Sequence, residues 1–291
     1  MTTTYATRDG LSLRAEVHGD CGRPVLLLHG GGQTRHAWQG TAAALAAAGW
    51  EAVAVDLRGH GDSEWSPDGE YRLEDFAADV QDVAAQLAAP PVLVGASLGG
   101  LASLLALADE PAVEASGLVL VDVAHRYELG GANRVVDFMR GTPEGFTNPG
   151  EAAAAVARYL PNRRAPAGGG GIEKNLRLRD GRWHWHWDPR LLELSGPMLD
   201  PAGTAEIEER LTASLADLTL PTLLVRGAGS DVLSRSIADE FAALVPHARV
   251  VDVERAAHMV AGDDNDRFTR AVLDFLGDLA VPAGSTASGA R

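Results

Sequence analysis

Short apolar runs, each closed by turn residues, recur along the 291-residue chain. Residues 24–32 read PVLLLHGGG, and similar runs begin near residues 51, 91, 117, 221 and 248. Continuous apolar runs are typical of strands that are buried on both faces, and alternation of such strands with helices indicates a parallel sheet. Helical periodicity is expected at about residues 34–48, 72–88, 98–110, 234–245 and 264–278. The pattern predicts an α/β fold with a mostly parallel, doubly wound sheet.

Two segments depart from this rhythm. Residues 11–18 alternate apolar and polar positions, which favours a strand at the edge of the sheet. Residues 124–216 contain a glycine run, proline breaks and the aromatic patch GRWHWHWDPR, but no clear buried strand. We expect this segment to form a mostly helical cap over the carboxyl edge of the sheet, where ligands bind in such folds.

The expected domain organisation follows from these departures. Residues 1–123 and 217–280 would form the α/β core, and residues 124–216 the inserted cap. Residues 281–291 have a disordered composition and are expected to carry no chemistry. An apolar face on the cap would suit a homodimer.

Composition excludes several classes of function. The formal net charge of −15 opposes binding to nucleic acid or to an anionic membrane surface. No window approaches the roughly 20 apolar residues of a membrane span, and the start of the chain lacks the pattern of a secretory signal. The single cysteine, Cys21, can form neither an internal disulfide nor a cysteine-rich metal site. We therefore expect a cytoplasmic protein.

One serine stands where a strand would meet a helix. Residues 92–103 read VLVGASLGGLAS, so an apolar run leads into Gly-Ala-Ser-Leu-Gly and an alanine-rich helical segment follows. Glycines let such a strained turn close without Cβ clashes, and the start of the helix directs backbone N–H groups toward the hydroxyl. An ordinary glycine–serine turn is the alternative. The strand before and the helix after favour Ser97 as an exposed nucleophile.

A serine nucleophile needs a base and a third group that orients the base. Asp231 lies a few residues past the run near 221, and His258 follows the run near 248. Both would stand at the same sheet edge as Ser97. Asp122 also ends an apolar run and is a second candidate for the acid.

The motifs HGGG, DLRGHGDS, GASLGG, GAGSD and AAHM together resemble the α/β-hydrolase superfamily. They occur in the family's order over about residues 5–280, and they are most similar to its serine-nucleophile branch, an esterase- and epoxide-hydrolase-like group. The resemblance implies an α/β-hydrolase fold with a helical cap inserted after the sixth strand, and no cofactor. It also implies Ser97 as nucleophile, His258 as general base and acid, and Asp231 as orienting acid, although some relatives place the acid at the position of Asp122.

An oxyanion hole requires two N–H donors directed at the developing charge. The resemblance implies the backbone N–H of Leu98 as one donor and that of Gly31 as the other, with Gly32 as second choice. Gln33 would either polarise a substrate group or be a surface residue. In DLRGHGDS, His60 is expected to fix a loop rather than to act as a catalyst.

The remaining candidates concern the substrate pocket. His36 would border it, and Trp183, Trp185 and Trp187 would line it or anchor the cap. His184 and His186 could face one side of a strand as a metal pair, but no third ligand stands nearby, so we expect no metal.

The nucleophile limits the reaction. A serine cannot replace the aspartate that opens epoxides, because an ether intermediate would not hydrolyse; it favours attack at a carbonyl. We expect a carboxylesterase that acts on small or medium apolar esters. A lactonase or a carbon–carbon hydrolase of ring-cleavage products is the alternative. Ala96 disfavours the carbon–carbon hydrolase, because those enzymes often have asparagine at this position. A perhydrolase side activity, or a catalytically slow ligand receptor of the same fold, is also open.

Overall fold

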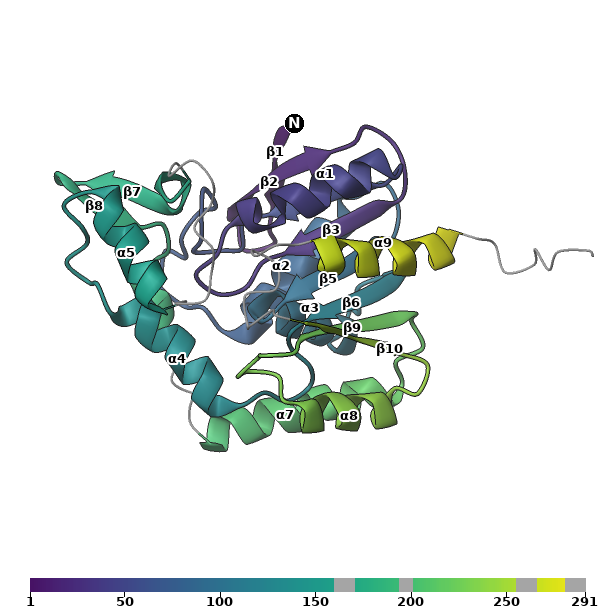
Figure 1. Cartoon of the computed structure of the whole chain (residues 1–291). Coiled ribbons are helices and arrows are strands. Elements are labelled where there is room, and N and C mark those ends of the chain that lie inside the picture. The colour runs from purple at the N-terminus through teal and green to yellow at the C-terminus, as the bar shows by residue number, and fades with distance from the viewer. Residues whose placement is uncertain (160–170, 194–200, 255–265, 281–291) are drawn as a thin grey trace, which may run out of the picture.

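The computed structural model describes residues 1–159, 171–193, 201–254 and 266–280. Their main feature is an eight-stranded sheet in the order β1-β2-β4-β3-β5-β6-β9-β10 (Figure 1). Pairing is parallel from β4 to β10 and antiparallel for β1 and β2. The strands are β1 (Thr2–Ala6), β2 (Ser12–His18), β3 (Pro24–Leu28), β4 (Glu51–Val55), β5 (Val92–Ala96), β6 (Gly117–Val121), β9 (Thr222–Gly227) and β10 (Arg249–Val253). The predicted α/β fold class is confirmed.

Helices cover both faces of the sheet, and the central strands are therefore buried along their whole length. In β3, Leu26 and Leu28 join the apolar cluster on the face of α2 and α3, while Val25 and Leu27 join the cluster on the face of α1 and α9. Figure 1 shows α1 and α9 in front of the sheet and α2 and α3 behind it. The core helices are η1 (Arg35–Trp38), α1 (Gln39–Ala47), α2 (Leu73–Ala85), α3 (Leu98–Ala108), α8 (Arg235–Leu244) and α9 (Asp266–Ala280).

The expectation that residues 11–18 form the edge strand is wrong. β2 pairs with β4 on one side and with β1 on the other, so β1 is the edge strand at this end of the sheet. The threonine-rich residues 2–6 carry no continuous apolar run, because this strand is only half-buried along its length. Its polar alternation is what an edge strand shows.

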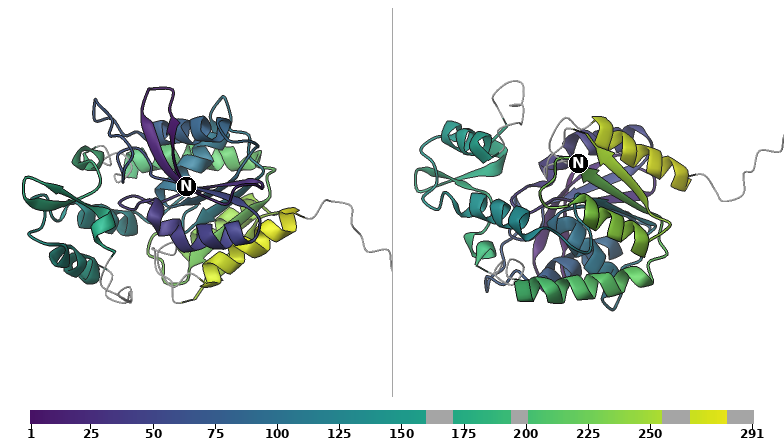
Figure 2. Two further views of the ribbon diagram at one scale, coloured as in Figure 1. Left: turned by 90° about the horizontal axis from the view of Figure 1, so that it is seen from above. Right: turned by 60° about the horizontal axis from the view of Figure 1, so that its bottom comes forward.

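The segment between β6 and β9 contains more than helices. A hairpin of β7 (Leu176–Arg179) and β8 (Arg182–Trp185) stands with two helices to one side of the sheet (Figures 1 and 2). The last helix of the segment, α7, packs instead on α3 of the core. The predicted cap range, residues 124–216, therefore includes a helix that lies against α3. The elements are α4 (Leu129–Arg140), α5 (Pro149–Tyr159), η2 (Glu173–Asn175), β7, β8, η3 (Pro189–Leu192) and α7 (Pro201–Ala216).

Aromatic packing holds the hairpin and its neighbouring helices together. The rings of Trp185 and Trp187 stack with 5.0 Å between centroids, and Phe138 and Phe146 approach Trp185 from two sides. The Trp185 indole also donates a hydrogen bond to Thr142. Alternation of tryptophan with polar residues over only four positions marks such a strand weakly in the sequence, which is why the hairpin was not expected.

Among the described residues, no helix has both the length and the apolar character to cross a membrane. The predicted tail at residues 281–291 lies outside the described residues.

Candidate active site

Ser97 occupies the turn between β5 and α3, with φ of 46° and ψ of −115°. A non-glycine residue rarely adopts positive φ, and such strain is typical of functional sites. The Ser97 N–H donates to the Val121 carbonyl on β6, and the Ser97 carbonyl accepts from Gly100 and Leu101 at the start of α3. The strained strand-to-helix turn predicted from the pentapeptide is thus present.

The two glycines that flank this turn, Gly95 and Gly99, are required because other backbone segments lie very close to them. A Cβ atom on Gly95 would lie 2.4 Å from the Gly99 carbonyl oxygen. A Cβ atom on Gly99 would lie 2.5 Å from the Leu28 carbonyl oxygen at the end of β3. Both contacts are with backbone, which cannot move aside cheaply. The turn can therefore pack against β3 only if these positions lack side chains.

We expect Gly99→Ala to lower the free energy of unfolding by about 1–3 kcal/mol, because the added methyl forces α3 away from β3. Gly277→Ala is the matched control, since a Cβ at that position of α9 meets nothing within 4 Å. There alanine should raise stability by about 0.5–1 kcal/mol through helix propensity. Urea unfolding of the two variants measures the difference. Equal effects of the two substitutions would contradict the packing argument.

The loop after β3 lies against Ser97. A Cβ atom on Gly30 would be 3.3 Å from Ser97 Cβ. The loop is closed by Gln33, whose N–H donates to the Gly30 carbonyl and whose Oε1 accepts from the Gly30 N–H at 2.9 Å. The Gly32 N–H donates to Nε2 of His60 at 3.1 Å. Three of the four N–H groups of residues 30–33 are therefore engaged.

The fourth belongs to Gly31. Within the described part of the chain, the Gly31 N–H makes no hydrogen bond. Leu98 opens α3, and the first N–H groups of a helix have no acceptor within it. The loop and the helix start thus offer one donor each beside Ser97. Of the two predicted glycines, Gly31 therefore has an N–H that no described residue engages, whereas the N–H of Gly32 is engaged by His60.

Asp122 is a buried carboxylate next to Ser97. Val121 pairs with Ala96 across β5 and β6, so the residues that follow them, Ser97 and Asp122, leave neighbouring strands side by side. Asp122 is 1% exposed and has φ of 54°. Its carboxylate accepts from the Gly227 N–H at 2.9 Å and from the Ser230 hydroxyl at 2.6 Å.

Asp231 has a different environment. Its side chain is 46% exposed and forms an ion pair with Arg134 of α4. Nε and one terminal nitrogen of Arg134 donate to the same carboxylate oxygen, at 2.9 and 2.5 Å. The carboxylate therefore links α4 to the loop after β9 at the surface. His258, the predicted base, lies outside the described residues.

The residues expected to line the pocket separate into groups. Trp185 and Trp187 are buried among aromatic rings of the segment between β6 and β9, whereas Trp183 is half-buried and its backbone pairs with Phe146. His36 is half-buried, with Nδ1 3.9 Å from a carboxylate oxygen of Glu16 on β2. Gln33 turns back onto its own loop, as described above.

Three buried histidines meet behind the loop, which the sequence did not indicate. The ring centroids of His29 and His60 are 5.1 Å apart, and those of His60 and His186 5.9 Å. Burial lowers the pKa of His29 to about 4 and that of His60 to about 3, and holds the pKa of His186 well below its usual value. The described residues contain no group of side chains suited to a metal ion. Each histidine stands in a separate motif, so only the fold could reveal the cluster.

These neutral histidines predict a pH-dependent stability. In the unfolded chain a histidine binds a proton below about pH 6.5. Burial outweighs the favourable charge of Asp56, so His60 stays unprotonated in the folded state. The unfolded state then binds more protons, and the free energy of unfolding should fall as the pH is lowered from about 6.5 toward 4, by about 1.4 kcal/mol per unit of pKa difference.

Urea unfolding between pH 7 and 4 measures this dependence. His60→Gln, which cannot titrate, should make the dependence shallower, whereas His247→Gln, in the exposed turn between α8 and β10, should not. Identical slopes for wild type and His60→Gln would contradict the assignment.

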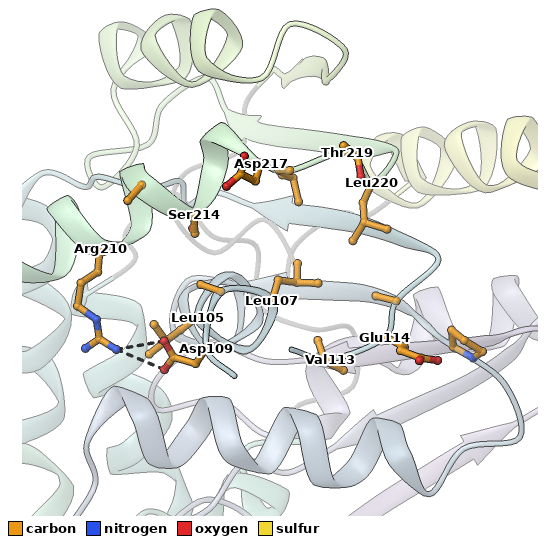
Figure 3. Close-up of a pocket in the computed structure, with 15 residues that line it drawn as sticks. Leu105, Leu107, Asp109, Val113, Glu114, Arg210, Ser214, Asp217, Thr219 and Leu220 are labelled. Atoms are coloured by element: carbon orange, nitrogen blue, oxygen red, sulfur yellow. Dashed lines mark hydrogen bonds and ion pairs between the residues drawn. The ribbon is translucent and has the colours of Figure 1, made fainter. Parts of the chain in front are cut away.

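A cavity of about 840 Å³ lies at the far end of α3. Leu105 and Asp109 line it together with Arg210 and Ser214 of α7, and Arg210 forms an ion pair with Asp109 across it (Figure 3). The eleven residues of α3 separate this end from Ser97 by about 16.5 Å at about 1.5 Å per residue. The cavity is thus separate from the candidate nucleophile.

Known proteins resemble nearly the whole chain. Residues 25–271 match the model of the alpha/beta hydrolase family. The esterase Rv0045c of Mycobacterium tuberculosis is 33% identical over 261 residues, which are 87% of this chain and 80% of that protein. The 3-hydroxybutyrate-oligomer hydrolase of Cupriavidus necator is 29% identical over 82% of this chain and 84% of its own.

Solved structures agree on the architecture. The crystal structure of E-2-(acetamidomethylene)succinate hydrolase superimposes with a TM-score of 0.82 over 95% of this chain and 99% of its own, at 24% identity, a likeness of fold alone. The crystal structure of the esterase Rv0045c gives a TM-score of 0.69 at 26% identity, covering 96% and 91% of the two chains. By sequence and by fold, the chain belongs to the α/β-hydrolase family.

Proposed function

We propose that the protein is a serine hydrolase that cleaves carboxylic esters of small to medium apolar substrates. The observation that carries this proposal is the strained turn at Ser97, beside which Leu98 and Gly31 each offer an N–H group. Two relatives that match most of the chain are named as an esterase and as a hydrolase of hydroxybutyrate oligomers, which are esters. Both support ester cleavage.

The proposed reaction proceeds through an acyl-enzyme. His258 accepts the proton of the Ser97 hydroxyl as its oxygen attacks the ester carbonyl, and the N–H groups of Gly31 and Leu98 stabilise the tetrahedral oxyanion. His258 then protonates the leaving alcohol, and afterwards activates water to release the acid. No cofactor takes part in this scheme.

For the orienting acid, the geometry favours Asp122 over Asp231. An orienting carboxylate works best when it is buried and held, because its charge then acts strongly on the imidazolium that forms. Asp122 is buried beside the nucleophile and held by Gly227 and Ser230. Asp231 is half exposed, and its charge is already balanced by Arg134. We therefore propose Asp122 as the acid of the triad.

Hydrolysis of p-nitrophenyl esters with two to eight acyl carbons tests the function. We expect turnover of at least one of these esters and covalent labelling of Ser97 by a fluorophosphonate, located by peptide mass spectrometry. The preferred chain length measures the acyl pocket. Much faster turnover of a lactone or a vinylogous diketone would replace the ester proposal. Saturable ligand binding without turnover or labelling would indicate a receptor.

A further inference from the structure

Gly32, which follows the proposed oxyanion donor, is held from three directions. Its N–H donates to Nε2 of His60, and its carbonyl oxygen lies 3.3 Å from Nε2 of His186 in the cap. A Cβ atom on Gly32 would lie 3.1 Å from the sulfur of Met139, on α4. Among the described residues, the cap thus reaches Gly32 through His186 and Met139, and it reaches the end of the same loop where the Thr34 hydroxyl donates to Asn175 at 3.2 Å.

The hydrogen bonds of His186 fix the direction of its proton. The Gly61 N–H donates to Nδ1 of His186 at 2.8 Å, so Nδ1 carries no proton. The ring is fully buried and neutral, so its single proton is on Nε2. Nε2 therefore donates to the Gly32 carbonyl. His60 has the opposite tautomer, because its Nε2 accepts from Gly32 and its Nδ1 donates to the Arg58 carbonyl at 2.9 Å.

The residues around His186 are anchored to the core. The Asp188 N–H donates to the Gly59 carbonyl at 2.9 Å, and the Tyr71 hydroxyl donates to the Asp188 carboxylate at 2.6 Å. On the adjacent strand, Arg177 forms an ion pair with Asp62 at 2.5 Å. His186 thus projects from a firmly docked part of the cap, which can hold a loop in one place.

We propose that His186 is a positioning residue for the oxyanion hole: through this histidine the cap holds the Gly32 carbonyl. The same peptide carries the Gln33 N–H, which donates to the Gly30 carbonyl and so fixes the Gly30–Gly31 peptide that presents the Gly31 N–H. This inference rests on the proposed function, since the position of Gly31 matters to the rate only if its N–H stabilises an oxyanion. A displacement of about 1 Å at such a donor can cost on the order of 100-fold in rate. Docking of the cap and assembly of the catalytic site are then one event.

Two isosteric substitutions separate positioning from structural support. In His186→Gln the amide nitrogen reaches the place of Nε2 and can donate to Gly32, while the Gly61 contact is lost. In His186→Asn the amide oxygen takes the place of Nδ1 and accepts from Gly61, while the Gly32 contact is lost. Each variant removes one hydrogen bond and neither can titrate, so a merely structural role predicts similar losses in both.

We expect His186→Asn to lower kcat for the best p-nitrophenyl ester about 10- to 100-fold, with KM changed less than about threefold. His186→Gln should keep kcat within about threefold of wild type. The rate of fluorophosphonate labelling of Ser97 should follow kcat. His184→Asn, two residues earlier on β8, should leave both rates unchanged. Equal activities of the Asn and Gln variants would overturn the proposal.

The outcomes of this test distinguish failure of the inference from failure of the proposed function. Absence of turnover and labelling in the wild-type protein would contradict the proposed function. Normal wild-type activity with an unaffected His186→Asn variant would contradict this inference alone. If a variant does not fold, ¹⁵N NMR of the wild-type protein tests the proposal instead, through the tautomer of His186 and its response to an adduct at Ser97. A boronic acid adduct of Ser97 should shift the His186 resonances of an Nε2–H tautomer, and an Nδ1–H tautomer or unshifted signals would overturn the proposal.

Discussion

Ser97→Ala is expected to lower ester hydrolysis by about 10⁵- to 10⁶-fold while the protein remains folded. The substitution removes the atom that attacks the carbonyl, and alanine offers no replacement. Stability should change little, because the polar group that anchors the turn is the Ser97 N–H, which donates to Val121 and is kept in the variant. Alanine at positive φ has much the same backbone cost as serine.

The measurement is the initial rate with the best p-nitrophenyl ester, together with thermal unfolding. Ser103→Ala is the control within the same helix. Its hydroxyl is buried and donates to the Gly99 carbonyl at 2.7 Å, so this variant loses a hydrogen bond but no nucleophile. It should keep activity within a few-fold of wild type. Activity of Ser97→Ala at the wild-type level would remove the basis of the proposed mechanism.

Local pattern predicted the core of the fold well. The runs near residues 24, 51, 91, 117, 221 and 248 all became strands, because strands buried on both faces must be apolar at every position. The edge was misplaced for the same reason. β1 alternates exposed and half-buried residues and has no such run, so the sequence pattern favours β2 as the outermost strand. The five expected helices of the core are present at the predicted places.

The site was predictable only where one motif contains the chemistry. The motif from Gly95 to Gly99 predicts the turn at Ser97, because the backbone of Gly95 lies close to that of Gly99 within the same motif and leaves no room for a side chain. The burial of Asp122 and the ion pair of Asp231 depend on strand order and on the docking of α4, which no local pattern encodes. The histidine cluster likewise combines three distant segments. Contacts between segments far apart in the sequence therefore account for what was missed.

The choice between the two acids has a direct test, in which Asp122→Asn should lower kcat by about 10²- to 10⁴-fold. The amide has nearly the same size as the carboxylate and can still accept from Gly227, but it carries no charge to stabilise a protonated His258. Asp231→Asn should change kcat less than about threefold, because its carboxylate is exposed and already engaged by Arg134. That exposed ion pair should contribute at most about 1 kcal/mol to stability.

Because the same chemical change is made at both positions, each variant controls for the other. Initial rates with the best ester, and rates of fluorophosphonate labelling, should fall only in Asp122→Asn. A large loss in Asp231→Asn alone would assign the acid to the loop after β9. Small losses in both would mean that neither carboxylate orients the base. A large loss at Asp122 would place nucleophile and acid on neighbouring strands, where the pairing of Ala96 with Val121 sets their separation.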